Sequence, residues 1–95
     1  MIAVYRRENS LTVRGHAGYA APGKDIVCAA VSALVETMIA AIEQVTTDHI
    51  RTNKATGLVD ITWERLSDRG LLLIDAFFVG IKMLSDQYPE HIRIV

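Results

Sequence analysis

The stretch GHAGYAAPGKDIVCAAVSAL, residues 15–34, joins a glycine-rich segment to a long apolar one and thereby decides the fold. Its glycines and its proline predict a loop over residues 16–25. Asp25 is a typical N-cap residue, and the alanine-rich, mostly apolar run from Ile26 to about Val45 predicts a long helix behind it. The only cysteine of the chain, Cys28, falls in the first turn of that helix. The stretch is therefore either a tight connection around a buried thiol or a reaction site.

The residues on either side of this stretch predict strands and one more helix. Residues 2–7 and 11–15 alternate apolar and polar side chains around the turn Asn9-Ser10, which predicts a β-hairpin. Farther along, we expect strands at 49–53 and 58–64 with a turn at 54–57 between them, a helix from the N-cap Ser67 to about Tyr88, and a short strand at 91–95. The resulting order, ββαββαβ, predicts an α+β fold: a single domain over residues 1–95 in which two helices pack on a mostly antiparallel sheet.

Length, charge and cysteine content exclude several classes of protein. With 95 residues and a formal net charge of −1, the chain has no broad basic surface, so we expect neither nucleic acid nor a membrane as a direct partner. A single cysteine cannot close an internal disulfide, and the longest uncharged run, Ile26–Val35, is ten residues, too short to cross a bilayer. The N-terminus lacks the layout of a signal peptide, because Arg6 and Arg7 follow only five residues. We expect a cytoplasmic protein.

Cys28 lies where a helix favours a reactive thiol. It is among the residues of the first turn whose backbone N–H groups are unpaired, and the helix dipole there favours the thiolate, the nucleophilic form. The amides of that turn are also suited to stabilise an oxyanion on an attacked carbonyl. The alternative is a buried cysteine that acts only as a small hydrophobic residue. Helical phase places Cys28 with Ser32 and two glutamates, which favours the reactive interpretation, although two apolar residues interrupt that face.

His16 is the natural general base for such a thiol. It sits where the second strand ends, and imidazole is the usual proton acceptor near neutral pH. The three glycines around it leave the loop free to fold over the helix start or to move when substrate arrives. Taken alone, an exposed loop histidine is more common than a catalytic one. His49 and His91 are expected at the surface or at a strand edge, and no group of residues has the spacing of a metal site, so we expect neither a metal nor a cofactor.

Asp25 and Ser32 each have two interpretations. As the N-cap, Asp25 stabilises the helix, but its carboxylate opposes ionisation of the nearby Cys28 thiol. The same carboxylate is also suited to orient His16, as the third member of a triad does, and the two roles are compatible. Ser32, one turn beyond Cys28, either forms a hydrogen bond near the thiol or serves simple helix packing.

Several segments taken together resemble a known family. HAGYA, GKDIVCAAVSAL, and LLLIDAFFVGIKML followed by QYPEHIRI are similar to the ribosomal-processing cysteine protease family, Prp, also called YsxB-like. The pairing of G-H-A-x-Y-A with D-I-V-C-A-A-V-S-A-L, twelve residues from His16 to Cys28, is far more specific than a lone cysteine. The likeness extends over nearly the whole chain, although Ala21-Pro22 stands where relatives often have acidic or polar residues.

The resemblance implies a small α+β homodimer whose cysteine and histidine form a catalytic dyad. Carried across by position, the nucleophile would be Cys28, the base His16, the supporting residues Asp25 and Ser32, and the hinge of a mobile loop Gly15. The implied reaction removes the N-terminal extension of a large-subunit ribosomal protein, the one numbered twenty-seven. Similar proteins also occur among phage structural genes, so a capsid or other phage assembly protein is the alternative substrate.

Two other function classes stay open. The apolar stretches of both expected helices leave room for the interface of a non-catalytic, dimeric assembly factor that binds a ribosomal or phage protein. A redox sensor is the weaker idea, because the chain has no second cysteine to resolve an oxidised thiol. We therefore expect a cysteine endopeptidase that acts on a protein substrate.

Overall fold

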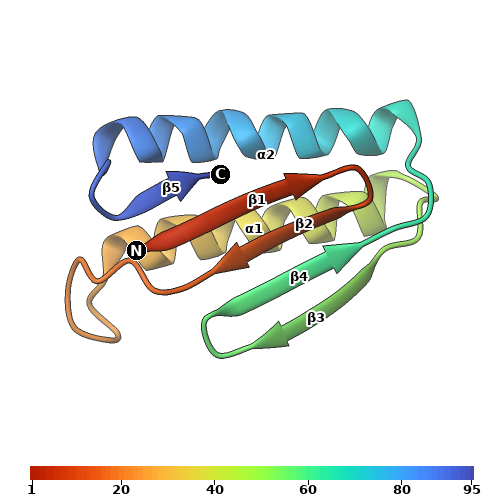
Figure 1. Cartoon of the computed structure of the whole chain (residues 1–95). Helices are drawn as coiled ribbons and strands as arrows, with labels where there is room; N and C mark the ends of the chain where they lie inside the picture. Colours follow the sequence, from red (N-terminus) through yellow and green to blue (C-terminus); the bar gives the residue numbers. More distant parts are fainter.

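Two helices and five strands follow one another in the predicted order, ββαββαβ (Figure 1). The computed structural model describes every residue from 1 to 95. Its elements are β1 (Ile2–Arg7), β2 (Ser10–Arg14), α1 (Ile26–Val45), β3 (Arg51–Ala55), β4 (Leu58–Thr62), α2 (Asp68–Gln87) and β5 (Ile92–Ile94). The predicted α+β class is confirmed, and both helices begin directly after the predicted N-caps, Asp25 and Ser67.

The predicted position of the third strand was wrong by two residues. We expected residues 49–53, whereas β3 covers Arg51–Ala55, so the turn shrinks to Thr56 and Gly57. Every residue of β3 is exposed, so no alternation of apolar side chains marks where it begins and ends. Its register is set instead by antiparallel pairing with β4, in which Ala55 lies opposite Leu58.

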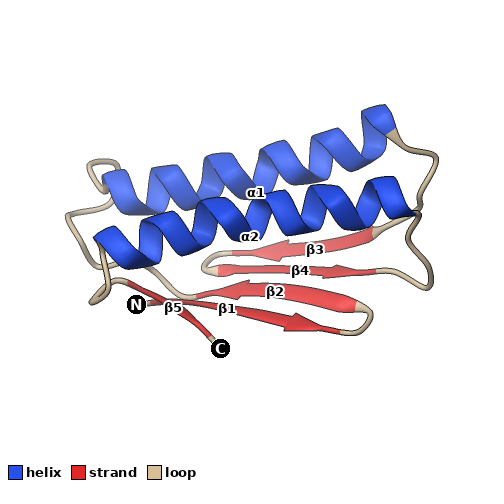
Figure 2. Cartoon of the chain, turned by 90° about the horizontal axis from the view of Figure 1, so that it is seen from above, coloured by secondary structure: helices blue, strands red, loops and turns tan.

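The strands form one sheet in the order β3-β4-β2-β1-β5, antiparallel except where β1 and β5 run parallel. The pairings also make β2 parallel to β3 and β4 parallel to β5, although neither pair is adjacent. Each helix therefore supplies the long crossover that a connection between parallel strands requires. Both helices lie on the same face of the sheet (Figure 2), which leaves the other face open.

The core fills the space between the sheet and the two helices. In α1, Val27, Val31 and Val35 recur every four residues and are buried, as amphipathic spacing requires. Facing residues are contributed by the sheet and by α2: Ile2, Val4, Leu11, Val13, Ile61, Ile74, Phe77 and Ile81. This packing fixes the first turn of α1 over the end of β2, where the loop of residues 15–25 begins.

Helix α1 is long and apolar enough to cross a membrane by length and composition alone. The core helix of a soluble protein passes the same test. Here the buried side of α1 belongs to the hydrophobic core that it shares with the sheet and with α2.

Candidate active site

Cys28 is the third residue of α1, and its side chain is half-buried. It packs against the edge of the hydrophobic core, but its sulfur is not enclosed in hydrocarbon. The backbone N–H of Ala17 donates a hydrogen bond to Cys28 Sγ at 3.3 Å. A donor directed at sulfur favours the thiolate over the thiol. The cysteine thus packs against the core on one side and lines a cavity on the other.

His16 lies just beyond β2 and lines the same cavity as Cys28. The cavity has a volume of about 260 Å³ and lies between α1 and the sheet, with Val31, Val35 and Leu58 among its apolar walls. The exposed imidazole rests against Gly57, where an added Cβ would lie 2.8 Å from His16 Nε2. The sulfur has its hydrogen bond with Ala17 and none with His16. His16 and Cys28 thus line one cavity without a hydrogen bond between them.

The Asp25 carboxylate fastens the loop to the helix. Its Oδ1 accepts from the N–H groups of Val27 and Cys28, at 3.0 and 2.9 Å, which caps α1. Its Oδ2 accepts from the N–H groups of Tyr19 and Ala20, at 2.9 and 3.2 Å. The bond from Cys28 is the largest cause of a pKa below the ordinary value for Asp25, and the other three amides lower it further, against the opposing effect of desolvation. No hydrogen bond joins Asp25 to His16, so the capping role is the one visible in this arrangement.

The same bonds bear on our expectation about the oxyanion. We expected free amides of the first helical turn to receive it, but those of Val27 and Cys28 are already donated to Asp25. The N–H of Ala29 is donated within the helix, to the carbonyl oxygen of Asp25. The backbone donor that points at the sulfur comes from the loop instead, at Ala17.

Ser32 and Gly15 both lie at the cavity, with different surroundings. Ser32 is exposed, one turn beyond Cys28, and its hydroxyl makes no hydrogen bond within the chain. Gly15 has φ +99°, and an added Cβ would lie 2.3 Å from the carbonyl oxygen of Met1. Its N–H donates to the carbonyl oxygen of Gly57 at 2.8 Å. Gly15 is thus the point at which the chain leaves the sheet, and only glycine fits there.

The sequence profile of the family described as cysteine protease Prp matches residues 1–93. This chain belongs to the Prp cysteine protease family. A relative from Mycoplasma genitalium, the ribosomal processing cysteine protease Prp, is 32% identical over 98 residues, which cover 99% of this chain and 94% of the relative. The predicted family and the predicted enzyme class, a cysteine protease, are confirmed.

Solved structures of similar chains share the fold. The ribosomal processing protease Prp of Staphylococcus aureus, in complex with a covalently linked product peptide, matches with a TM-score of 0.89 at 24% identity, over 98% of this chain and 94% of that one. The protein SMU.848 of Streptococcus mutans matches with a TM-score of 0.72 at 30% identity, over 99% of this chain and 91% of that one. The fold described above is thus the Prp fold.

Two residues at this Prp site escaped the sequence analysis. Gly57 was predicted only as part of a turn. In the structure, the His16 ring lies against Gly57, and the carbonyl oxygen of Gly57 accepts a hydrogen bond from the N–H of Gly15. His91 was expected at a surface or strand edge, but it is half-buried and its Nδ1 lies 2.8 Å from the carbonyl oxygen of Ala17. Both contacts join segments far apart in the sequence, so no local pattern indicates them.

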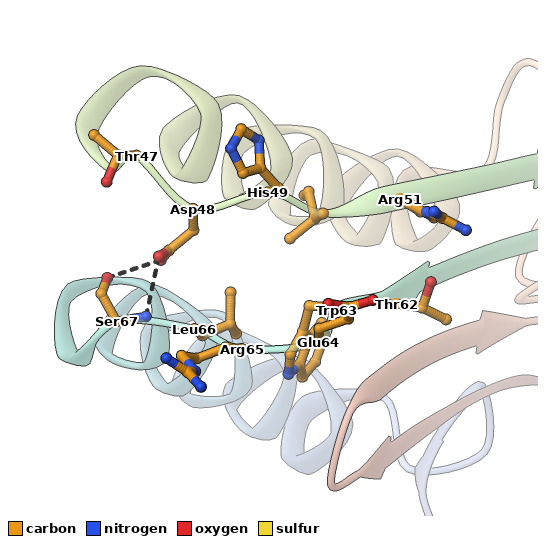
Figure 3. A pocket seen from close by; sticks show the side chains of 11 residues that line it. Thr47, Asp48, His49, Arg51, Thr62, Trp63, Glu64, Arg65, Leu66 and Ser67 are labelled. Atoms are coloured by element: carbon orange, nitrogen blue, oxygen red, sulfur yellow. Dashed lines mark hydrogen bonds between the residues drawn. The ribbon is translucent and has the colours of Figure 1, made fainter.

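A larger cavity, about 740 Å³, lies at the opposite end of the molecule, between the α1–β3 and β4–α2 connections (Figures 1 and 3). Asp48 joins the two connections there by accepting from the N–H and the hydroxyl of Ser67, at 3.0 and 2.8 Å. Figure 3 shows the side chains of His49, Arg51 and Arg65 pointing in different directions. These side chains therefore do not point toward one common position, and no cysteine lines this cavity.

Replacing Gly57 by alanine should displace the His16 imidazole. We expect Gly57→Ala to lower the rate of peptide cleavage by about 10- to 100-fold, because the methyl group removes the resting position from which the expected base approaches Cys28, and small misplacements of such a group have effects of that size. Gly23→Ala is the matched control, since Gly23 also has a positive φ, +83°, but has nothing within 4 Å of an added Cβ. Both variants should lose roughly 1–2 kcal/mol of stability from the left-handed backbone. Equal losses of cleavage in the two variants would contradict a specific role for the Gly57–His16 contact.

Asp25 should make the stability of the fold depend on pH in the acid range. Because the pKa of Asp25 is lower in the folded chain than its value of about 3.9 in an unfolded one, folding releases a proton in this window and stability rises with pH. The contribution is complete above about pH 5 and is lost as pH falls through the folded pKa. Thermal melting of wild type and Asp25→Asn from pH 6 to pH 2 measures it. The two melting temperatures should converge as the pH falls, and a constant gap would refute the assignment.

Proposed function

We propose that this chain is an endopeptidase in which Cys28 is the nucleophile and His16 the general base. The observation that carries the proposal is that a member of a cysteine protease family has one cysteine, and that this cysteine shares a cavity with a histidine. The Ala17 amide directed at Sγ supplies the sulfur with a hydrogen-bond donor. Asp25 supports the site by holding the loop, and Ser32 lies beside the cavity.

The proposed reaction has two stages. The imidazole of His16 turns toward Cys28 and takes the thiol proton, and Sγ then attacks the scissile carbonyl to give a tetrahedral oxyanion. Collapse of this intermediate transfers the proton from His16 to the leaving amine and leaves an acyl group on sulfur. Water, deprotonated by His16, hydrolyses the thioester and regenerates the thiol. Gly15 is the proposed hinge for any movement of the loop that accompanies substrate binding.

The proposed substrate is the precursor of a large-subunit ribosomal protein, the one numbered twenty-seven, from which the enzyme removes an N-terminal extension. The Mycoplasma genitalium relative, named a ribosomal processing protease, supports this choice. The Staphylococcus aureus protease, solved with a substrate peptide and with a product peptide, supports a peptide segment as ligand. Such a precursor is made in the cytoplasm, so we propose the same location for the enzyme.

Mass spectrometry of the precursor incubated with the enzyme tests the proposal. We expect one cut near the N-terminus with wild type, none with Cys28→Ala, and a rate lowered by about 10²- to 10⁴-fold with His16→Gln, the range that a general base contributes. His49→Gln is the matched control, because His49 lines the distant cavity. Cleavage that survives Cys28→Ala would exclude Cys28 as the nucleophile, and an unprocessed precursor with wild type would exclude this substrate.

We also propose that the chain forms a homodimer through the outer side of α2. Leu72, Val79 and Met83 follow helical spacing there and are 66%, 63% and 67% exposed. The open face of the sheet is a poorer candidate, because arginines from four strands point from it: Arg7, Arg14, Arg51 and Arg93. An apolar stripe exposed on one helix is what a symmetric contact between two copies buries.

Sedimentation analysis tests the dimer. Wild type should sediment as a dimer at micromolar concentration, and the double variant Val79→Glu with Met83→Glu as a monomer, because burying two carboxylates from each copy is strongly unfavourable. Asn53→Glu, on the open face of the sheet, is the control and should remain a dimer. A monomeric wild type, or a double variant that still dimerises, would contradict the proposed interface.

A further inference from the structure

Ala17, the residue after the proposed base, is held on three sides. Its side chain is buried in the core, with 2% of its surface exposed. Its N–H, which belongs to the peptide group following His16, donates to Cys28 Sγ at 3.3 Å. Its carbonyl oxygen lies 2.8 Å from His91 Nδ1. The peptide groups on both sides of Ala17 are therefore fixed, one by the sulfur and the other by His91.

His91 is held in place by hydrogen bonds of its own backbone N–H and carbonyl groups. It directly precedes β5, its N–H donates to the carbonyl oxygen of Tyr88 at 2.9 Å, and its carbonyl oxygen accepts from the N–H of Ile2 at 2.8 Å. Figure 1 shows the start of β5 and the loop of residues 15–25 at the same end of the molecule. The ring of Tyr19 packs edge-on against His91 and Tyr88, with centroids 5.4 and 5.5 Å apart. His91 thus offers the loop a fixed point that the loop itself does not contain.

The contact between His91 and Ala17 shows which ring nitrogen of His91 carries a hydrogen. A carbonyl oxygen can only accept, so His91 Nδ1 must carry a hydrogen and donate it to Ala17. Nδ1 carries a hydrogen in the neutral tautomer that makes this bond and also in the imidazolium. The bond therefore persists when His91 gains a proton at Nε2. The proposed reaction uses no proton from His91, so its contribution is one of position.

We propose that His91 is a positioning residue of the active site, which acts through Ala17 to keep the loop amide directed at the Cys28 sulfur. The inference rests on the proposed function for its catalytic meaning. Without the Nδ1 donor, the peptide group between Ala17 and Gly18 loses its partner, and residue 17 is held only by its buried side chain and by its bond to the sulfur. The sulfur then keeps its amide donor for a smaller fraction of the time, and the thiolate loses part of its stabilisation.

Three substitutions separate the hydrogen bond of His91 from the packing of its ring. His91→Asn places an amide N–H where Nδ1 stands but removes the ring against Tyr19. His91→Leu has a similar size to asparagine and offers no donor. His91→Phe keeps an aromatic ring beside Tyr19 and also offers no donor. A role in hydrogen bonding predicts that the asparagine variant behaves like wild type, and that the leucine and phenylalanine variants share one defect.

The principal measurement is the rate of alkylation of Cys28 by iodoacetamide as a function of pH, at temperatures where circular dichroism shows every variant folded. Loss of one hydrogen bond corresponds to about a fivefold effect, so the leucine and phenylalanine variants should react about five times more slowly at neutral pH. Their kcat for peptide cleavage should fall at least as much, with little change in KM. His91→Asn should restore both values to within about twofold of wild type.

Two results would overturn the inference. One is His91→Phe with wild-type alkylation and cleavage, which would show that the hydrogen bond has no role. The other is His91→Asn as impaired as His91→Leu, which would assign the effect to packing of the ring. Alkylation does not depend on cleavage of any substrate, so this test remains decisive even if cleavage survives Cys28→Ala and the proposed function fails.

Discussion

The carboxylate of Asp25 accepts two hydrogen bonds from the first turn of α1 and two from the loop that precedes it. The loop therefore cannot leave the helix without giving up the bonds on Oδ2, and the helix start cannot fray without giving up those on Oδ1. Because β2 lies on the other side of the loop, this side chain and the His91–Ala17 hydrogen bond together set where residues 16–20 stand relative to Cys28. The rest of the site depends on that placement.

The position of Asp25 has an electrostatic consequence for the thiol. A carboxylate three residues from Cys28 opposes formation of the thiolate, and it also occupies amides that would otherwise face the sulfur. Four hydrogen bonds compensate its own charge, and the Ala17 amide supplies Sγ with a separate donor. In this site the helix amides are thus bonded to a structural carboxylate, and a loop amide is bonded to the sulfur of the proposed nucleophile. If the loop moves away, the sulfur loses its amide donor, whereas the bonds of the helix amides to Oδ1 remain.

The sequence could predict the elements of this fold better than the contacts of the site. Helix α1 was predictable at both ends, because an N-cap and an unbroken apolar pattern are local signals. Strand β3 was misplaced because its side chains are all exposed and only pairing with β4 defines its register. The contacts of Gly57 with His16 and of His91 with Ala17 span 41 and 74 residues, respectively. The order of the strands in the sheet brings these residues together, and no local sequence pattern indicates the contacts.

His16 can approach Cys28 either by movement of the loop or by rotation of its own side chain. The hydrogen bonds around the loop favour rotation. Moving the loop as a body breaks the bonds of Tyr19 and Ala20 to Asp25 and that of Ala17 to His91. Rotating the His16 side chain breaks no hydrogen bond, since the imidazole only rests against Gly57. Exposed side chains change rotamer within picoseconds to nanoseconds, whereas loop movements take nanoseconds to microseconds. Since both residues line one cavity, rotation of the imidazole over a stationary backbone is the less costly route to a proton acceptor at the sulfur.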